Sequence, residues 1–272
     1  MDIASELIIG IDRGASFTDF AVVRDTSLVD HLSIETRDWP EIRAALKEIQ
    51  GKYPTGQSAF SGAANDMPAD LNEQVVDVPE IESIGLGGAA LAERETCLVI
   101  SMGTGSAMVH VDQGAAKHVG GTGVGGGTIK GLAKLICGTD NVHRVEELAL
   151  KGSAAVMNMT IGDLGLGDLS FLSADATVSN FAGIKSDRRE DKAAGILSLV
   201  AETIGIIGSL CALHAGCADN IVAVGKVSAN RHVRETHERV GVLYQTRFQF
   251  PEHAGCAMAY GATLKYLDMH EI

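Results

Sequence analysis

Two segments that lie far apart in the chain follow the same plan, and this duplication restricts the fold more than any other feature. The first spans residues 7–23 and the second spans residues 97–111, and in each an apolar run leads into a small polar turn and a second apolar run. The turns contain Gly14 in the first copy and Gly103 and Gly105 in the second. Apolar, β-branched runs around a glycine turn are typical of paired strands, so each segment predicts a strand, a tight turn and a strand.

Helical patterns separate these strands. Strands that alternate with helices predict the α/β class. The duplicated plan predicts two lobes, which we assign to residues 1–95 and 96–272. Apolar residues recur at helical spacing over residues 38–49, 80–91, 129–136, 142–158 and 191–216, a further buried strand is expected over 221–225, and a last helix over 255–262.

The glycine-rich turns predict sites for anionic groups. Glycine accounts for 32 of the 272 residues. A third glycine-rich turn, residues 120–128, leads into a helix, and the strand expected over residues 221–225 ends in Gly225. Such turns let backbone N–H groups converge on an anion, and the dipole of a helix that begins there adds to the attraction. Lys and Arg number 22 against 35 Asp and Glu, a net charge of −13, which argues against a nucleic-acid partner but permits a local pocket for a phosphorylated small molecule.

The remaining composition predicts a cytoplasmic protein with no membrane partner. The five cysteines show no CxxC spacing, which favours buried, reduced thiols over a disulfide framework or a zinc site. Residues 1–6 carry acids ahead of the first apolar run, unlike a signal peptide. The longest apolar stretch, residues 193–218, is interrupted by Glu202, Thr203 and His214, so we expect a buried helix there and not a membrane span.

Several of these segments resemble the actin, sugar kinase and acetate kinase ATPases. Residues 10–16 (GIDRGAS) resemble their first phosphate motif, 103–105 their second, and 222–225 their adenosine motif. Within that superfamily the chain is most similar to type II pantothenate kinases, through residues 80–87, 101–106 and, most specifically, the glycine-rich stretch 119–132. The resemblance implies a two-lobed actin-like (ribonuclease H-like) fold, in which each lobe is a mixed sheet flanked by helices and the nucleotide lies in the cleft between them.

The resemblance also implies roles for individual residues. Glu80 matches the catalytic base that takes the proton from the primary hydroxyl of the substrate, Thr104 matches a residue that contacts pantothenate, and Asp12 matches the acid near the magnesium ion. The nucleotide-binding positions that it implies are Gly10, Asp12, Arg13, Gly14, Ala15, Ser16, Gly103, Thr104, Gly105, Gly125, Gly126, Gly127, Thr128 and Gly225.

Two of these assignments have plain structural alternatives. Phosphoryl transfer needs backbone donors, a hard cation and a base, and an acid at the end of a buried strand beside a glycine turn is well placed to reach Mg²⁺. Asp12 could instead cap its turn, and Glu80, which follows Pro79, could be an acid favoured by the helix dipole. Glu82 is then the next candidate for the base.

One position departs from the family. Where type II pantothenate kinases carry an arginine just before the Val-Gly-Gly stretch, this chain has His118, preceded by Lys117. Arginine offers a planar, bidentate fork that histidine cannot reproduce. Either Lys117 or His118 binds the acceptor less rigidly, or the acceptor is a different alcohol.

The resemblance therefore implies an ATP- and Mg²⁺-dependent enzyme that phosphorylates pantothenate at its primary hydroxyl, the first step of coenzyme A biosynthesis. It also implies a homodimer, with the apolar helix over residues 193–216 at the interface. The alternatives are a kinase of the same fold for another small alcohol, a pseudokinase, or an activator ATPase of the superfamily. Such activators bind an iron–sulfur cluster at a dimer interface, and five scattered cysteines argue against that.

Overall fold

The computed structural model of the protein describes residues 7–54, 57–63, 67–72, 75–165 and 173–270. Its core is a pair of five-stranded mixed sheets with the same strand order. The first sheet has the order β3-β2-β1-β4-β5, built from β1 (Leu7–Arg13), β2 (Thr18–Arg24), β3 (Ser27–Ile34), β4 (Gln57–Gly62) and β5 (Val75–Asp77). The second, read from the matching edge, has the order β8-β7-β6-β11-β12, built from β6 (Thr96–Met102), β7 (Ser106–Asp112), β8 (Ala115–Thr122), β11 (Ile221–Val224) and β12 (Phe248–Gln249).

The two sheets also share their strand directions. In each, the first three strands form an antiparallel meander, β1-β2-β3 in one and β6-β7-β8 in the other. The first strand of each meander then pairs in parallel with a strand that arrives later, β4 or β11, and that strand pairs in parallel with β5 or β12. The duplication expected from the sequence is confirmed.

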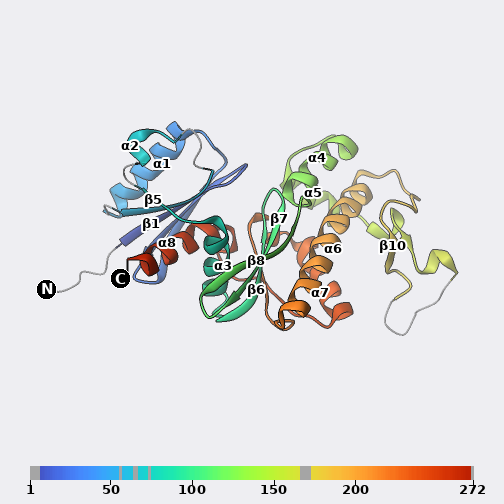
Figure 1. Cartoon of the computed structure of the whole chain (residues 1–272). Helices are drawn as coiled ribbons and strands as arrows, with labels where there is room; N and C mark the ends of the chain where they lie inside the picture. Colours follow the sequence, from blue (N-terminus) through green and yellow to red (C-terminus); the bar gives the residue numbers. More distant parts are fainter. Residues whose placement is uncertain (1–6, 55–56, 64–66, 73–74, 166–172, 271–272) are drawn as a thin grey trace.

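Helices cover both faces of each sheet. Their bounds are α1 (Trp39–Lys52), α2 (Ala69–Asn72), α3 (Glu80–Leu91), α4 (Gly126–Cys137), α5 (Val142–Ala149), α6 (Arg189–Ala215), α7 (Arg231–Tyr244) and α8 (Ala257–Met269). Short 3₁₀ turns are η1 (Ala154–Val156), η2 (Gly162–Leu164), η3 (Lys226–Ala229) and η4 (Ala254–Cys256), and β9 (Met159–Thr160) pairs with β10 (Thr177–Ser179) apart from the main sheets. Figure 1 shows the sheet with β1 and β5 on one side of α3 and α8, and the sheet with β6, β7 and β8 on the other.

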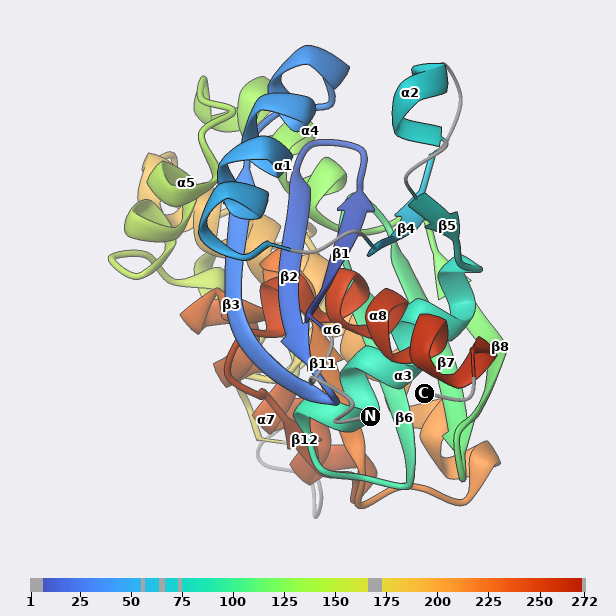
Figure 2. The same ribbon diagram turned by 90° about the vertical axis from the view of Figure 1, so that its left-hand side faces the viewer.

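The layers follow from the apolar faces of the helices. α1 buries Ile42, Ala45, Leu46 and Ile49, one face at helical spacing, against the outer face of the first sheet. α8 covers the opposite face of that sheet, as Figure 2 shows looking onto it. α3 lies on the inner face of the second sheet, and α4, α5 and α6 cover its outer face. The central layer is therefore the pair α3 and α8, sandwiched between the two sheets.

One helix from each side of the expected boundary at residue 95 packs on the sheet formed by the other side. α3, from the first segment, packs on the second sheet, and α8, from the second segment, packs on the first. From here on the first lobe means the first sheet with α1, α2 and α8, and the second lobe means the second sheet with α3 to α7. The segment boundary at 95 itself stays a prediction.

α3 and α8 cross at very short range because glycines face each other at the contact. A Cβ on Gly87 would lie 1.8 Å from the Ala257 carbonyl oxygen, and a Cβ on Gly261 would lie 1.9 Å from that of Ser83. Real Cβ atoms do not approach oxygen this closely, so the crossing requires glycine at both positions. This contact joins the two lobes at the centre of the molecule.

α6 is a core helix. It is long and apolar enough to cross a membrane by length and composition, but 56% of its most apolar window is buried in the chain's own core. It packs against Leu98, Ile100 and Met108 of the second sheet. The buried helix expected here is confirmed.

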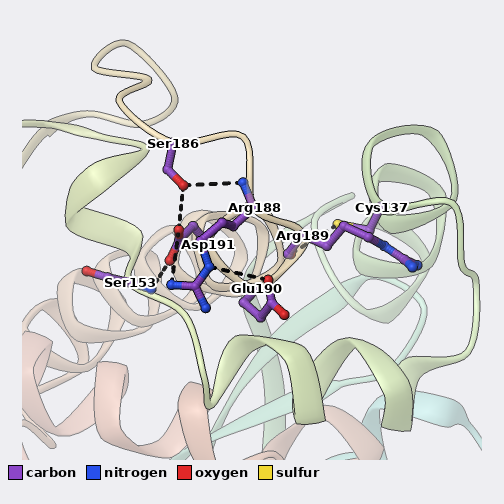
Figure 3. A network of polar contacts seen from close by, with 7 residues as sticks. All are labelled: Cys137, Ser153, Ser186, Arg188, Arg189, Glu190 and Asp191. Carbon is purple, nitrogen blue, oxygen red and sulfur yellow. Dashed lines mark hydrogen bonds and ion pairs between the residues drawn. The ribbon is translucent and has the colours of Figure 1, made fainter.

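The beginning of α6 is fixed by a polar network (Figure 3). The buried carboxylate of Asp191 accepts hydrogen bonds from the Ser153 N–H at 2.8 Å and the Ser186 hydroxyl at 2.6 Å. This corrects the helix expected over residues 142–158: α5 ends at Ala149, and the chain turns to meet the start of α6. The turn needs glycine at 152, where a Cβ would lie 2.1 Å from the Glu190 carbonyl oxygen.

Candidate active site

The second glycine turn, the start of α4 and the end of β11 lie together in the second lobe. The Gly126 N–H donates to the Gly103 carbonyl at 2.8 Å, and the Gly127 N–H donates to that of Thr104 at 2.9 Å. Gly225 ends β11 with φ +88°, and a Cβ there would lie 2.6 Å from the Met102 carbonyl oxygen. The three segments that the sequence predicts to bind a nucleotide are thus joined to one another by backbone contacts.

This arrangement assigns particular partners to the triple-glycine segment. Besides the two bonds to the second turn, the Gly125 N–H donates to the Thr128 hydroxyl at 3.2 Å. The N–H groups of residues 125–127 are therefore engaged within the protein, while the positive end of the α4 dipole still faces this region. Contact of residues 125–128 with nucleotide phosphates stays a prediction, and we expect it to rest on the dipole and on close backbone approach.

The first glycine turn connects β1 to β2. The Gly14 N–H donates to the Phe17 carbonyl at 2.9 Å, which closes the turn and leaves Ala15 and Ser16 exposed at its tip. Gly10 lies deeper in β1, where a Cβ would meet the Ala259 carbonyl oxygen at 1.9 Å. Gly10 therefore serves the contact of β1 with α8, while Ala15 and Ser16 are the exposed part of the predicted phosphate turn and Gly14 is half-buried.

Arg13 faces away from that turn. Its guanidinium donates to the Arg37 carbonyl at 2.8 and 3.0 Å and to the Ala63 carbonyl at 2.9 Å, and it lies 4.3 Å from the centre of the Trp39 ring. The side chain is buried and braces the loops beside the first sheet. The predicted nucleotide contact of Arg13 would thus fall to its backbone.

Asp12 is the most perturbed acid of the site. It lies at the end of β1, directly opposite Asp19 of β2 in the strand register, and its Oδ1 is buried with no hydrogen-bond partner among the described residues. Burial, followed by the negative charges of Asp19 and Glu80, raises the pKa of Asp12 to about 8, while Lys226 acts in the opposite direction. A buried carboxyl with an unsatisfied oxygen beside two other acids suits a hard divalent cation.

A magnesium ion would find few protein ligands here. Within the described ranges, no three His, Cys, Asp or Glu side chains lie close enough together to hold a metal ion. Magnesium commonly keeps several waters and binds through one or two carboxylates and the phosphates of a substrate. The donor set around Asp12 fits that mode, with Asp12 as the protein ligand.

Glu80 is the first residue of α3 and is exposed. Its charge is one of the causes of the raised pKa of Asp12, which places the two acids near each other across the lobes. Glu82 is half-buried on the same helix. Glu80 is thus both a first-turn acid favoured by the helix dipole and an acid open to a substrate next to Asp12; its role as base stays a prediction.

His118 and Lys117 lie on opposite faces of β8. Ala116 faces α3, since a Cβ on Gly85 would lie 2.7 Å from that of Ala116, and Val119 packs with the core on the other face. His118 shares the α3 face with Ala116, because the two lie opposite Val109 and Val111 of β7, which belong to the core that α3 covers. Lys117, between them in the strand, faces the other side. Of the two replacements for the family arginine, His118 is therefore the one on the side of Glu80. Thr104 is exposed at the tip of the second turn, as a substrate contact requires.

Two residues of the site were not predicted from the sequence. The Lys226 ammonium, on η3, forms an ion pair with the buried Asp19 and donates to the Ser33 hydroxyl at 2.7 Å. Asp19 could have been predicted from the β1–β2 hairpin, because strand pairing places it opposite Asp12. Nothing in the local sequence of Lys226 indicates that it reaches the other lobe.

The cysteines do not form a cluster site. All five are free, and four of them are buried. Burial is the main cause that raises the pKa of the Cys97 and Cys256 thiols to about 12, which keeps them protonated and unreactive. The burial expected from the apolar surroundings of the cysteines is thus found for four of the five, and Cys211 is half-buried.

Comparison with known proteins gives a family and a fold. Residues 92–264 match the model of the Fumble family. The type II pantothenate kinase of Bacillus cereus strain G9842 is 26% identical over 281 residues, covering 95% of this chain and 98% of the relative. The resemblance drawn from the sequence motifs is confirmed.

Solved structures agree on the fold. The activator of 2-hydroxyisocaproyl-CoA dehydratase from Clostridium difficile, with bound ADPNP, superposes with a TM-score of 0.65 at 18% identity, covering 97% of this chain and 96% of that one. A ROK hexokinase from Thermus thermophilus gives a TM-score of 0.59 at 14% identity, covering 97% and 99%. The two-lobed actin-like fold is confirmed.

Proposed function

The chain belongs to the Fumble family, and from that membership we propose that it transfers the γ-phosphoryl group of ATP to the primary hydroxyl of pantothenate, the first step of coenzyme A biosynthesis. Curated relatives that cover nearly the whole chain are named type II pantothenate kinase, which supports both the kinase activity and the acceptor. The structural observation that carries the proposal is the pairing of an exposed acid, Glu80, with a buried, unsatisfied acid, Asp12, beside the glycine turns.

The residues divide the work of phosphoryl transfer. The exposed first turn and the second turn with α4 hold the polyphosphate, and Asp12 would hold the magnesium ion, which supplies positive charge to the phosphates when bound. Glu80 accepts the proton of the acceptor hydroxyl as the hydroxyl oxygen bonds to the γ-phosphorus, and the bond from that phosphorus to the bridging oxygen breaks and releases ADP. Catalysis of this kind is mostly positioning and charge neutralisation, so a scaffold with one base suffices.

The acceptor is held from the second lobe in this account. His118 lies on the face of β8 that α3 covers, and Thr104 is exposed at the adjoining turn. We assign His118 to the carboxylate of pantothenate and Thr104 to its polar backbone. Lys117, on the outer face of β8, is a weaker candidate than its sequence position suggested.

A second candidate function is phosphorylation of another small alcohol. The observation that favours it is the same His118, because a single imidazole gives a carboxylate-bearing acceptor less charge and fewer hydrogen bonds than an arginine fork. Such an acceptor would carry the hydroxyl but lack the carboxylate.

The protein acts in the cytoplasm as a homodimer in this proposal, without nucleic-acid or membrane partners. Most of α6 is buried within its own chain, so its apolar sequence does not by itself require a partner. Exposed apolar side chains do gather near the ends of α6 and α7, namely Leu210, Leu213, Val242 and Leu243. We place the subunit contact there.

The test is a screen of acceptors with the purified protein, Mg²⁺ and ATP, in which ADP release is measured for pantothenate, pantetheine and related alcohols. Pantothenate-dependent ADP release is the expected result. Release with an uncharged alcohol but not with pantothenate would favour the second candidate. No release with any alcohol would overturn the kinase assignment.

A further inference from the structure

Lys226 joins the two lobes on the side of the glycine turns. It opens η3 directly after Gly225, at the end of β11 in the second lobe. Its ammonium forms an ion pair with Asp19 of β2 and donates to the Ser33 hydroxyl of β3 at 2.7 Å, both in the first lobe. It also lies 5.2 Å from the centre of the Phe17 ring.

The groups on either side of this contact belong to the predicted nucleotide site. In the first lobe, the Phe17 carbonyl closes the first glycine turn, and Asp19 pairs with Asp12 in the strand register. In the second lobe, Gly225 packs against the Met102 carbonyl at the start of the second turn. One side chain therefore connects the two halves that must surround the same polyphosphate.

The surroundings of Lys226 hold its side chain in place. The Gly225 N–H donates to the Ala254 carbonyl at 2.8 Å, which packs η3 on η4. Gly255 of η4 lies beside the ammonium, since a Cβ there would be in van der Waals contact with Nζ at 3.5 Å. Beside it, the His31 ring of the first lobe meets the His253 ring of the second with centroids 4.7 Å apart.

Loss of the ion pair between Lys226 and Asp19 should weaken the contact between the lobes measurably, because Asp19 is buried. Asp19 is only 7% exposed, whereas the side chain of Lys226 is 34% exposed. A charged hydrogen bond to a buried carboxylate is stronger than an exposed surface pair, and removal of one partner leaves the other buried and unpaired. The α3–α8 crossing joins the lobes at the centre, so the Lys226 contact is a second point that limits their rotation.

We propose that Lys226 is a positioning residue that holds the first phosphate turn against the second lobe and so keeps the nucleotide site closed. The proposal rests on the proposed function only in taking a nucleotide as the ligand. It assigns Lys226 and Asp19 to the relative placement of the lobes, and Asp12 and Glu80 to the chemistry.

The test changes Lys226 and leaves the acids beside Asp12 in place. Lys226→Met removes the ion pair and the bond to Ser33, and Lys226→Arg keeps the charge and can restore both contacts. Asp19→Asn with Lys226→Met removes both charges and is the second variant should Lys226→Met not fold. Lys52→Met is the control, because Lys52 forms an ion pair with Asp30 within the first lobe. Binding is compared at equal Mg²⁺. Binding of Mg-AMPPNP is measured by calorimetry, and the radius of gyration of the nucleotide-free protein by small-angle X-ray scattering.

We expect Lys226→Met to bind Mg-AMPPNP about 10- to 100-fold more weakly, the loss of one charged hydrogen bond, and to show a larger radius of gyration. Lys226→Arg should recover most of the affinity and the compact shape, and the control should match the wild type. Unchanged affinity and unchanged radius in Lys226→Met would overturn the proposal, as would weaker binding with an unchanged radius. If the wild type itself fails to bind Mg-AMPPNP, the proposed function fails, whereas the radius of gyration still decides whether Lys226 holds the lobes together.

Discussion

Asp12 is the residue on which the chemistry of the site depends most. Burial and the charges of Asp19 and Glu80 raise its pKa from 3.8 to about 8. A carboxyl whose pKa is higher in the folded protein than in the unfolded chain binds more protons when folded. Its contribution to stability is therefore complete below about pH 4 and is lost as the pH rises through about 8.

The variant Asp12→Asn tests this directly, because an amide does not ionise. Without metal, the free energy of unfolding of the wild type relative to the variant should fall as the pH rises from about 4 to about 8, measured by urea unfolding at several pH values. Magnesium with nucleotide should reverse the fall in the wild type and not in the variant. A difference that does not change with pH would mean that Asp12 ionises like an exposed acid.

Glu80→Gln should separate binding from turnover, because it removes the proton acceptor and keeps the shape. We expect Mg-ATP affinity close to that of the wild type and a kcat about 10²- to 10⁴-fold lower. Glu82→Gln, two residues along the same helix, is the matched control and should keep its kcat. Near-normal kcat in Glu80→Gln would leave Glu80 as a helix-terminus acid only.

His118→Arg should improve the use of pantothenate. A guanidinium at this position supplies a charged, bidentate donor to the carboxylate of the acceptor, and a gain of 1.4 kcal/mol corresponds to about a tenfold lower KM. Lys117→Arg, on the outer face of β8, should leave KM unchanged. The prediction is checked by steady-state kinetics, and an unchanged KM in His118→Arg would show that the acceptor carboxylate does not lie at this position.

The sequence predicts the residues of the site that sit beside glycine turns, and misses those that depend on tertiary contacts. Asp12 is recognisable because it ends an apolar run just before Gly14. Lys226 reaches Asp19 across 207 positions of the chain, and no local pattern records such a contact. The hydrogen bonds from the Gly126 and Gly127 N–H groups to the second turn likewise form only when the start of α4 packs on that turn.

At the scale of elements, the α3–α8 crossing sets the distance between the two sheets. Ser83 and Gly87 of α3 meet Ala257 and Gly261 of α8 through backbone atoms, with no side chain between the helices. Because Glu80 begins α3, the same crossing fixes where the candidate base stands relative to β1 and Asp12. A change at the crossing should therefore affect folding first and activity with it.

Gly87→Val should destabilise the protein by about 3 kcal/mol or more, because overpacking forces backbone apart at a contact with no space. Gly131→Ala is the matched control on the exposed side of α4, where a Cβ would meet nothing within 4 Å. It should stabilise the protein by about 0.5–1 kcal/mol through helix propensity. Urea unfolding of both variants checks the pair, and an equal effect at the two sites would contradict the crossing.

Elements with apolar runs were predictable, and elements at sheet edges were not. The strands β1, β2, β6 and β7 and the helix α6 follow directly from apolar runs and periodicity. The edge strand β3 alternates exposed and half-buried residues, and β8 is rich in glycine, so neither shows a strong strand pattern. The early end of α5 is set by Gly152 against Glu190, a contact that only the folded chain creates.

At the scale of the whole molecule, the two lobes repeat one topology. In each lobe the turn after the first strand is the glycine turn for which we predict a contact with nucleotide phosphates. α3 and α8 exchange lobes in the middle, and Lys226 joins the lobes again near the turns. These two contacts thus set how the lobes sit relative to each other, and with them the predicted base, the predicted cation ligand and the two predicted phosphate turns.

We predict that this site transfers the γ-phosphoryl group of ATP to pantothenate with Glu80 as the base. The decisive measurement is mass spectrometry of the products that the wild type and Glu80→Gln form, side by side, with Mg²⁺, ATP and pantothenate. The wild type should form pantothenate with one phosphate on its primary hydroxyl together with equimolar ADP, and the variant should form almost none. ADP without phosphorylated pantothenate, or equal product from both proteins, would refute this assignment.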